Sequence, residues 1–171
     1  MLGSTKYTKG VDLWSVGCIL GELISGKPMF PGTSTMNQLQ RIIAVTGSPS
    51  PEDVDAIQSA FASSMLDSIP ETEHKSLQEM FPKASPEALD LLEKLLQFNP
   101  EKRIDAEAAL NHPYVALFHN PAEEPTCDKP ISLYFDDNKK YSINEYRERL
   151  YAEIRKRREK RRARTKEEEK K

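Results

Sequence analysis

Residues 11–24 read VDLWSVGCILGELI and form the longest largely apolar stretch of the chain. Its apolar side chains are Val11, Leu13, Trp14, Val16, Cys18, Ile19, Leu20, Leu23 and Ile24. At 3.6 residues per turn these positions leave no polar face, which is typical of a helix that is buried on all sides. Ser25 and Gly26 follow directly and predict its end, because glycine is preferred just past a helix C-terminus.

Asp12 is the polar residue that stands out at the start of this apolar helix. A lone buried carboxylate is costly unless it is hydrogen-bonded or paired. We therefore predict that Asp12 accepts backbone N–H groups from a segment packed on the helix start. In the alternative, Asp12 is exposed in the first turn and interacts only with the helix dipole.

Two more helices are predicted after a Pro/Gly loop at residues 27–32. Residues 36–43 carry apolar side chains at i, i+3, i+6 and i+7, and this stripe ends before Thr46-Gly47. Residues 50–53 combine a capping serine, a proline at the first helical position and acidic residues in the first turn. The apolar residues that follow at helical spacing are Val54, Ile57 and Phe61.

The second half of the chain contains three further helix starts. Ser85-Pro86-Glu87 opens a helix with leucines facing inward, Asp105 caps a short helix, and residues 142–145 form a capping box before a last helix. Residues 66–84 read as a loop, and residues 117–141 as an extended segment. With no convincing pair of strands, the fold class is predicted to be all-α.

Composition excludes several classes of protein. No run of about 18 uncharged apolar residues is present, so no transmembrane helix is expected. The N-terminus lacks the apolar segment of a secretory signal. The chain has two cysteines, neither within a CxxC pair, which argues against a disulfide framework or a structural zinc site. We expect a reduced intracellular protein, cytoplasmic, nuclear or both.

Charge divides the 171-residue chain into an acidic body and a basic tail. The net charge is −2, but the residues from Arg155 onward hold eleven Lys/Arg and only four Asp/Glu, a net charge of +7. The first 154 residues therefore carry a net charge of −9. We expect the acidic body and the basic tail to have different roles.

Several segments, in the right order and spacing, resemble eukaryotic protein kinases. DLWSVGCIL (12–20) resembles the start of the central helix of the large lobe, and FNPEKRI (98–104) with NHPY (111–114) resembles the end of that lobe. FPG (30–32) and TGSPSPED (46–53) resemble mitogen-activated protein kinases, including the insert after their G helix. YSINEYRERLY (141–151) is similar to the atypical extracellular-signal-regulated kinases.

The resemblance implies the fold and the domain organisation. It implies an all-α, large (C-terminal) lobe of a protein kinase from the central helix onward, with an insert and a C-terminal extension of the mitogen-activated type. Residues 1–115 are expected to form the second half of that lobe. Residues 116–154 are expected to form the extension with a docking patch and a last helix, and residues 155–171 a basic charged tail.

The resemblance also assigns structural anchors. The residue matching Asp12 hydrogen-bonds the backbone of the catalytic loop and anchors the regulatory spine. Trp14 belongs to the same central-helix motif. The residue matching Arg103 pairs with the glutamate of an Ala-Pro-Glu motif, which this sequence does not contain.

The residues that perform phosphoryl transfer in this family are not in the sequence. Kinases position ATP with a glycine-rich loop, a strand lysine, a catalytic Asp and metal-holding Asn and Asp residues. This sequence has no GxGxxG, no VAIK-like lysine, no HRD and no DFG. No catalytic, cofactor-binding or metal residue is therefore assigned. ATP and Mg²⁺ are expected only in a full-length parent, and the chain alone is expected to be inactive.

Two docking surfaces follow from the resemblance. The first matches the acidic patch that captures basic motifs of upstream kinases, substrates and phosphatases, and its residues here are Asn120, Glu123 and Glu124. Asn120 stands where the family usually has an acid. In the alternative, this segment is only a solvated acidic loop. Met36 and Leu39 match wall positions of the second docking site, although core packing is the expectation we favour for them.

The run at residues 155–164 has three interpretations. It is a solvated, partly helical extension, a nuclear-import signal, or a phosphate-binding segment for nucleic acid or acidic membrane. No aromatic residue interleaves its charges, so base stacking has no support.

Two functions are compatible with the whole chain. In the first, the chain is part of a mitogen-activated serine/threonine kinase and retains only the substrate-lobe scaffold and docking surfaces. The alternative is a non-catalytic docking module that binds kinase partners or substrates.

Overall fold

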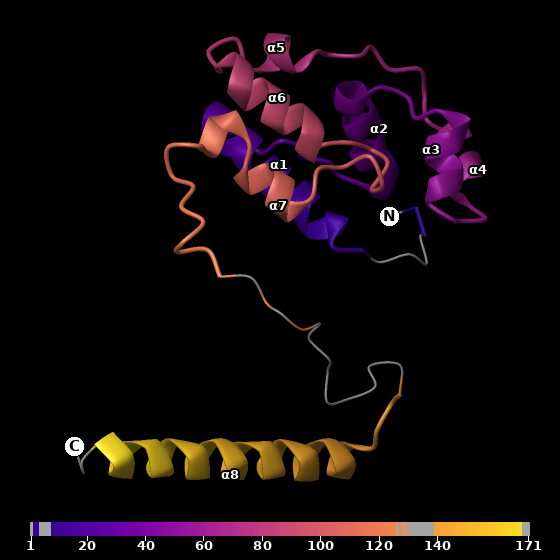
Figure 1. Ribbon diagram of the computed structural model, residues 1–171. Helices are drawn as coiled ribbons and strands as arrows, with labels where there is room; N and C mark the ends of the chain where they lie inside the picture. The colour runs from indigo at the N-terminus through magenta and orange to yellow at the C-terminus, as the bar shows by residue number, and fades with distance from the viewer. Residues whose placement is uncertain (1, 4–7, 126, 128, 130–138, 169–171) are drawn as a thin grey trace. The chain divides into compact units, whose positions relative to one another are not determined.

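The computed structural model describes residues 2–3, 8–125, 127, 129 and 139–168. The chain divides into two compact units, Met1–Glu124 and Pro125–Lys171, here called unit 1 and unit 2. The helices of unit 1 are α1 (Gly10–Ser25), α2 (Thr35–Thr46), α3 (Pro51–Ala56), α4 (Ala62–Asp67), α5 (Leu77–Met80), α6 (Pro86–Leu95), α7 (Ala106–Leu110) and the 3-10 helix η1 (Pro113–Val115) (Figure 1). Unit 2 holds α8 (Ile143–Glu168). The described residues contain no strand, which confirms the all-α prediction.

Helix α1 ends where the sequence predicts. Gly26 adopts a left-handed conformation with φ of 69°, and its N–H donates to the carbonyl of Glu22 at 2.8 Å. Only glycine reaches this conformation without steric cost, and the hydrogen bond satisfies a carbonyl of the last turn. The chain then leaves the helix axis and enters the Pro/Gly loop.

Helix α1 packs closely against α6, the most buried helix of unit 1. Leu92 and Leu95 of α6 are at most 1% exposed. Gly17 is buried on the facing side of α1, where an added Cβ would lie 2.9 Å from both the Cβ of Leu95 and the Cδ2 of Leu96. A side chain at position 17 would therefore clash with Leu95 and Leu96 unless these residues or the two helices shifted.

The opposite face of α1 is open, so the prediction that this helix is buried on all sides is wrong. Val16, Ile19 and Leu23 are 50%, 57% and 78% exposed. The reason is that the described residues supply a packing partner mainly on the glycine face. All-round apolarity shows which surfaces a helix is able to bury, but not which neighbours are present.

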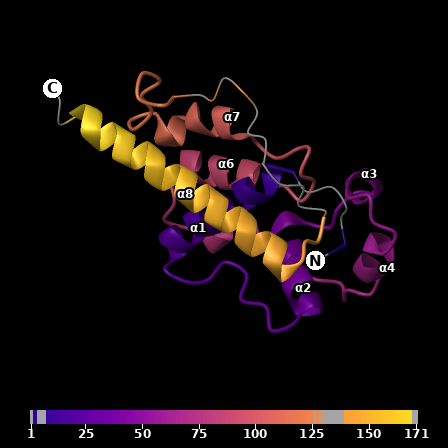
Figure 2. The ribbon, with the colours of Figure 1, turned by 90° about the horizontal axis from the view of Figure 1, so that it is seen from below.

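Two apolar clusters hold the helices of unit 1 together. One cluster buries Leu2, Leu39, Ile57 and Ala62, and joins α2 to α3 and α4. The two views of Figures 1 and 2 both place α3 and α4 side by side at the edge of unit 1. The other cluster buries Met29, Phe81, Leu92 and Leu96 between α1, α5 and α6.

Asp53 ties the α3 segment to the loop after α6. Its Oδ2 accepts hydrogen bonds from the backbone N–H and the hydroxyl of Ser50, which completes the predicted capping of α3. Its Oδ1 accepts from Lys102 Nζ at 2.7 Å and from Asn99 Nδ2 at 2.9 Å. These contacts hold the pKa of Asp53 well below its usual range. The hydrogen bond from Lys102 is the largest cause, and the one from Asn99 is the next.

The stretch at residues 66–84, predicted to be a loop, contains α5 and the end of α4. The start of α5 is a capping box in which Ser76 Oγ accepts from the N–H of Glu79, and Glu79 Oε2 accepts from the N–H of Ser76. This Ser-x-x-Glu signal was readable from the sequence. Helix α3, in contrast, ends at Ala56, and Phe61 is exposed instead of continuing the apolar stripe.

Unit 2 is a long helix with a short apolar stripe. Ser142 and Glu145 form the predicted capping box, with the N–H of Ser142 donating to Glu145 Oε2 at 2.8 Å. The stripe, all of it exposed, consists of Ile143, Tyr146, Leu150, Tyr151 and Ile154. The helix continues to Glu168 although the stripe ends at Ile154. Residues 130–138, within the predicted extended segment, lie outside the described residues.

Replacing Asp53 by asparagine tests the connection between α3 and the loop after α6. At pH 7 we expect the free energy of unfolding to fall by about 1–2 kcal/mol, because the cap and two acceptor contacts are weakened. Since the folded-state pKa of Asp53 is lowered, its contribution is present above the unfolded value of about 3.9 and is lost as the pH falls through the folded value. Urea unfolding of both proteins at pH 7 and at decreasing pH measures this difference.

The matched control is Asp55→Asn, which removes the same charge from an exposed position of α3. Its urea midpoint at pH 7 should stay near that of the wild type. An equal loss in both variants would contradict a specific role for Asp53.

Candidate functional site

Arg103 and Trp14 form a contact that links α1 to the loop after α6. The guanidinium lies over the Trp14 ring, with Cζ 5.1 Å from the ring centroid. Its Nη1 donates to the carbonyl of Gly10 in the first turn of α1. Its Nε and Nη2 donate to the carbonyl of Gln97 at 3.1 and 2.7 Å. Arg103, 93 residues from Gly10 in the sequence, thus joins the start of α1 to the segment just past the end of α6.

Partial burial shapes the electrostatics of this contact. Desolvation lowers the pKa of Arg103, and it raises the pKa of the nearby Cys18 thiol. Trp14 also stacks on Phe30, with ring centroids 5.7 Å apart and planes 16° from parallel. Arg103 Nη2 also lies 3.4 Å from the carbonyl of Phe98. The stacked indole and the carbonyls of Gly10, Gln97 and Phe98 use the planar fork of an arginine in a way that a lysine ammonium cannot reproduce.

Asp12 does not occupy a buried position in this structure. It lies in the first turn of α1 and its side chain is exposed. The described residues place no segment over it, so the prediction that it accepts backbone N–H groups is not met here. The alternative given above, an acid beside the helix N-terminus, matches the observed placement.

An apolar groove lies between α1, α6 and α7. Its walls include Leu13 and Val16 of α1, Leu91 and Leu95 of α6, Ala106, Ala109 and Leu110 of α7, Val115 of η1, and Phe118 after η1. Phe118 is 85% exposed and the neighbouring Leu117 is 94% exposed. This groove continues the uncovered face of α1.

The acidic loop after η1 contains two differently placed glutamates. Glu124 is engaged inside the loop, because its Oε2 contacts His119 Nδ1 at 2.8 Å and its Oε1 accepts from the N–H of Asn120 at 3.0 Å. Glu123, in contrast, is exposed. Asn120 Oδ1 accepts from the N–H of Ala122 and so serves as a turn residue. Of the three predicted docking residues, Glu123 is the one that offers an exposed charge.

The two predicted wall residues of the second docking site lie on α2. Leu39 is 2% exposed and belongs to the cluster with Ile57 and Ala62. A side chain buried there presents no surface to a partner, which matches the core packing that we favoured for it. Met36 is only partly buried.

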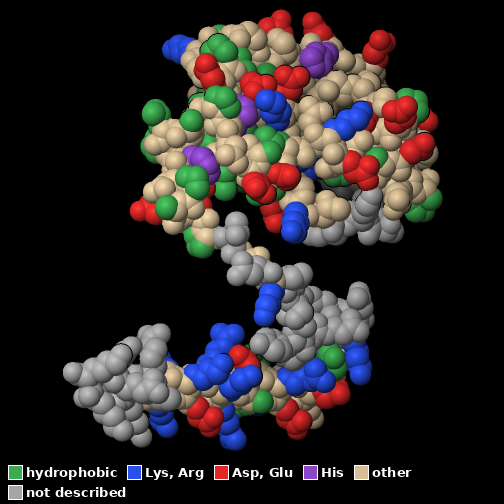
Figure 3. All heavy atoms as spheres, viewed as in Figure 1, with side chains coloured by type: hydrophobic (Ala, Val, Ile, Leu, Met, Phe, Trp, Pro, Cys, Tyr) green, Lys and Arg blue, Asp and Glu red, His purple; other side chains and the backbone are tan. Residues whose placement is uncertain are grey.

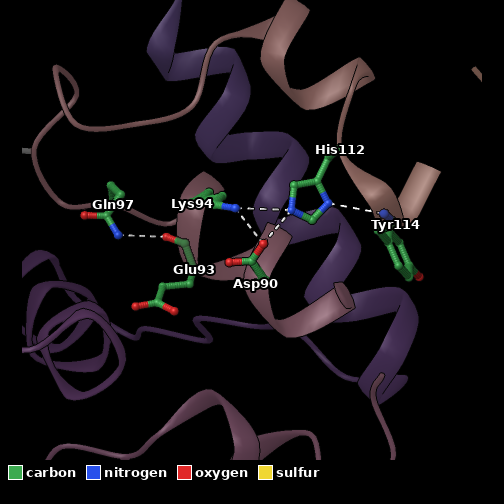
Figure 4. Close-up of polar contacts among 6 residues, drawn as sticks. All are labelled: Asp90, Glu93, Lys94, Gln97, His112 and Tyr114. Atoms are coloured by element: carbon green, nitrogen blue, oxygen red, sulfur yellow. Dashed lines mark hydrogen bonds and ion pairs between the residues drawn. The ribbon is translucent and has the colours of Figure 1, made fainter. Parts of the chain in front are cut away.

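His112, next to Pro113, is a residue that the sequence suggests to be structural, but its contact with Asp90 on α6 was not predicted (Figure 4). His112 is 4% exposed, and its Nε2 lies 2.7 Å from Asp90 Oδ2 on α6. Its Nδ1 accepts from the N–H of Tyr114 at 3.3 Å, which assigns the ring proton to Nε2. Lys94 Nζ also contacts Asp90 Oδ2, at 2.6 Å, and is the largest cause, ahead of His112, of the lowered pKa of Asp90.

These contacts are structural. They fasten η1 to α6 at a position where the chain turns after α7. The sequence signal was weak, because Asp90 and His112 are 22 residues apart and no short motif links them. Among the described residues, no group of three His, Cys, Asp or Glu side chains is placed to hold a metal ion.

Comparison with known proteins identifies the family. The protein kinase domain matches residues 1–115, about two thirds of the chain. The chain belongs to the protein kinase family. Its matched residues include both ends of the Arg103 contact with α1, so this contact lies within the matched domain.

Several similar proteins are mitogen-activated protein kinases. The chain is 64% identical over 154 residues to extracellular signal-regulated kinase 2 of Dictyostelium discoideum, which covers 90% of this chain and 42% of the relative. It is 51% identical over 155 residues to mitogen-activated protein kinase 15 of Xenopus laevis, covering 90% of this chain and 26% of the relative. The chain thus forms part of a mitogen-activated protein kinase domain and spans less than half the length of these relatives.

Replacing Arg103 tests whether it joins α1 to α6. Arg103→Met and Arg103→Lys should each lower the free energy of unfolding by about 2–3 kcal/mol, because neither side chain satisfies several carbonyls at once. Trp14 is the only tryptophan of the chain, so its fluorescence reports on this contact directly. Urea unfolding followed at Trp14 emission measures the loss.

Arg41→Lys, at an exposed position of α2, is the matched control and should leave the midpoint within experimental error. Full stability of Arg103→Lys would show that charge alone is needed and would contradict the role of the guanidinium fork.

Proposed function

We propose that this chain provides the substrate-side lobe of a serine/threonine kinase of the mitogen-activated type. The contact of Arg103 with Gly10 and Trp14 carries the proposal. It joins the central-helix motif at residues 12–20 to the motif at residues 98–104, the two segments that most closely resemble the kinase family. Family membership of residues 1–115 supports the same assignment.

The chemistry belongs to the complete kinase. Such a kinase transfers the γ-phosphoryl of ATP to Ser or Thr of proteins, and by resemblance to sites followed by proline. ATP and Mg²⁺ would be held by a glycine-rich loop, a strand lysine, and Asp and Asn residues that this sequence lacks. The part described here would supply a platform, and no residue of it is assigned to the transfer step.

Finer assignments follow from the same proposal. Helix α1 would be the central helix of the large lobe, and α3 and α4 would belong to the insert. Asp12, exposed in this structure, would meet the catalytic loop of a complete kinase, and Arg103 would meet the glutamate of its Ala-Pro-Glu motif. The open face of α1 at Val16, Ile19 and Leu23 supports this proposal, because it provides apolar surface for further kinase segments.

Docking of partners would rest on the loop of Glu123. A single exposed carboxylate attracts a basic peptide less strongly than a cluster of acids, so we propose a weak site for basic motifs of upstream kinases, substrates or phosphatases. A cytoplasmic or nuclear location would suit such partners. No described helix is long and apolar enough to cross a membrane.

A non-catalytic docking module is the second candidate function. It is favoured by one observation, the exposed carboxylate of Glu123, which a basic peptide could reach without any nucleotide site. Such a module would compete for kinase partners through the same loop without transferring phosphate.

A chimera tests the first proposal. Residues 1–154 replace the matching segment of the Dictyostelium discoideum relative, and transfer of labelled phosphate from ATP to a Ser-Pro peptide is measured. We expect the chimera to be active, because this segment would supply the second half of the large lobe and the relative would supply the rest of the kinase. The same chimera with Arg103→Met should lose most of its activity.

The isolated 171-residue chain is the second arm of this experiment. It should neither bind Mg-ATP nor label the peptide. A folded but inactive chimera would contradict the lobe assignment and favour the docking module. Labelling by the isolated chain would contradict the assignment of the chemistry to other segments.

Charge reversal at Glu123 tests docking. Glu123→Lys should weaken binding of a fluorescent peptide carrying three Lys/Arg residues by about tenfold at low salt, since attraction becomes repulsion. Glu124→Gln should change the affinity less than about twofold, because that carboxylate is already engaged by His119 and Asn120. Fluorescence anisotropy measures both.

Glu71→Lys, at an exposed position outside this loop, makes the same charge change and serves as control. Equal weakening by Glu71→Lys would show that net charge alone attracts the peptide, and docking at the loop would be abandoned.

A further inference from the structure

The C-terminal half of α8 carries an unusual concentration of positive charge. Residues 155–162 hold seven Lys/Arg and one acid, Glu159, which gives a net charge of +6. All eight side chains are exposed, and Figure 3 shows Lys and Arg gathered along this helix. Arg157 also pairs with Glu153 one turn earlier, at 3.0 Å.

The helical conformation sets the spacing of these charges. At a rise of about 1.5 Å per residue, the eight residues cover about 12 Å. Duplex DNA carries one negative charge per about 1.7 Å of its axis, so the same length holds about seven phosphates. The positive charge of the helix segment therefore matches the negative charge of a duplex of equal length.

The direction of the side chains narrows the choice of partner. Successive helix positions are about 100° apart, so the basic residues at 155–158 and 160–162 surround the helix on all sides. A flat anionic membrane would contact only one side of such a helix. A groove that encloses the helix brings phosphates to several sides at once.

Groove dimensions favour duplex DNA over duplex RNA. A helix with side chains is about 10–12 Å across, and the major groove of B-DNA is about 12 Å wide. The major groove of A-form RNA is deep and too narrow for side chains to read. Residues 155–162 contain no Asn, Gln or aromatic side chain, so the contacts would be with phosphates and independent of sequence.

We propose that residues 155–162 of α8 bind duplex DNA in its major groove through phosphate contacts. The segment is a second binding surface, separate from the loop of Glu123 and independent of the kinase assignment. The apolar stripe that ends at Ile154 takes no part in it.

The test uses the full 171-residue chain and a fluorescent 20-bp DNA duplex of mixed sequence. Anisotropy titrations at several salt concentrations should give a dissociation constant in the micromolar range at low salt. The logarithm of the association constant should fall with the logarithm of salt concentration with a slope of about −5, as expected for about six neutralised phosphates.

Charge variants of α8 supply the decisive comparison. Arg158→Glu/Arg161→Glu/Arg162→Glu should weaken binding more than tenfold and reduce the salt slope by about 3. Lys27→Glu/Lys75→Glu/Lys83→Glu makes the same change in net charge at exposed positions of unit 1 and should retain the slope. Glu159→Lys, which adds charge within the run, should tighten binding.

Two results with the variants would overturn the proposal: the α8 triple variant binds DNA as tightly as the wild type, or the unit 1 triple variant is weakened as much as the α8 triple variant. Two results with other partners would also overturn it: the wild type binds an RNA duplex of the same length more tightly than DNA, or it binds phosphatidylserine vesicles more tightly than DNA. Circular dichroism at 222 nm checks that the variants keep their helix. The variant Arg158→Lys/Arg161→Lys/Arg162→Lys keeps the charges and should keep the affinity for DNA. A loss of affinity in this variant would contradict the proposal that the positive charge of the segment determines binding.

Discussion

The close approach of α1 and α6 at Gly17 is the constraint on which unit 1 depends. A single added carbon at this position would lie within 2.9 Å of Leu95 and Leu96. Because α1 and α6 pack closely there, Leu92 and Leu95 are removed almost completely from water and contribute apolar burial of about 1.5–3 kcal/mol each. The glycine face of α1 therefore determines how the helix is oriented, and its other face is left open.

Two polar contacts extend this arrangement to the ends of the helices. Arg103 joins the first turn of α1 to the carbonyl of Gln97, just past the end of α6, while Asp53 joins α3 to the loop that carries Arg103. Both contacts link segments that are far apart in the sequence, and both meet at residues 97–103. The loop at residues 97–103 is therefore a junction at which α1, α3 and the end of α6 are connected.

Local signals predicted most of the fold, and partners distant in sequence explain the rest. Capping serines at residues 50, 85 and 142 and the glycine at residue 26 fixed helix ends, because each acts on its own turn. Burial of α1 on all sides was predicted wrongly, since apolarity does not reveal which neighbours are present. In the candidate sites, the role of Glu123 as the exposed acid and the inward engagement of Glu124 depend on how the loop folds back on His119. The contact of His112 with Asp90 was missed for the same reason.

A Gly17→Ala substitution tests the central claim most directly. In an exposed helix this change stabilises by up to about 1 kcal/mol, because alanine is the better helix former. The close contact with Leu95 and Leu96 predicts the opposite sign: a lower urea midpoint and faster amide hydrogen exchange in α6. Gly10→Ala, whose added carbon would meet only ordinary contacts of 3.4 Å or more, should cause no such loss. A Gly17→Ala chain as stable as the wild type, with unchanged protection of α6, would contradict this account.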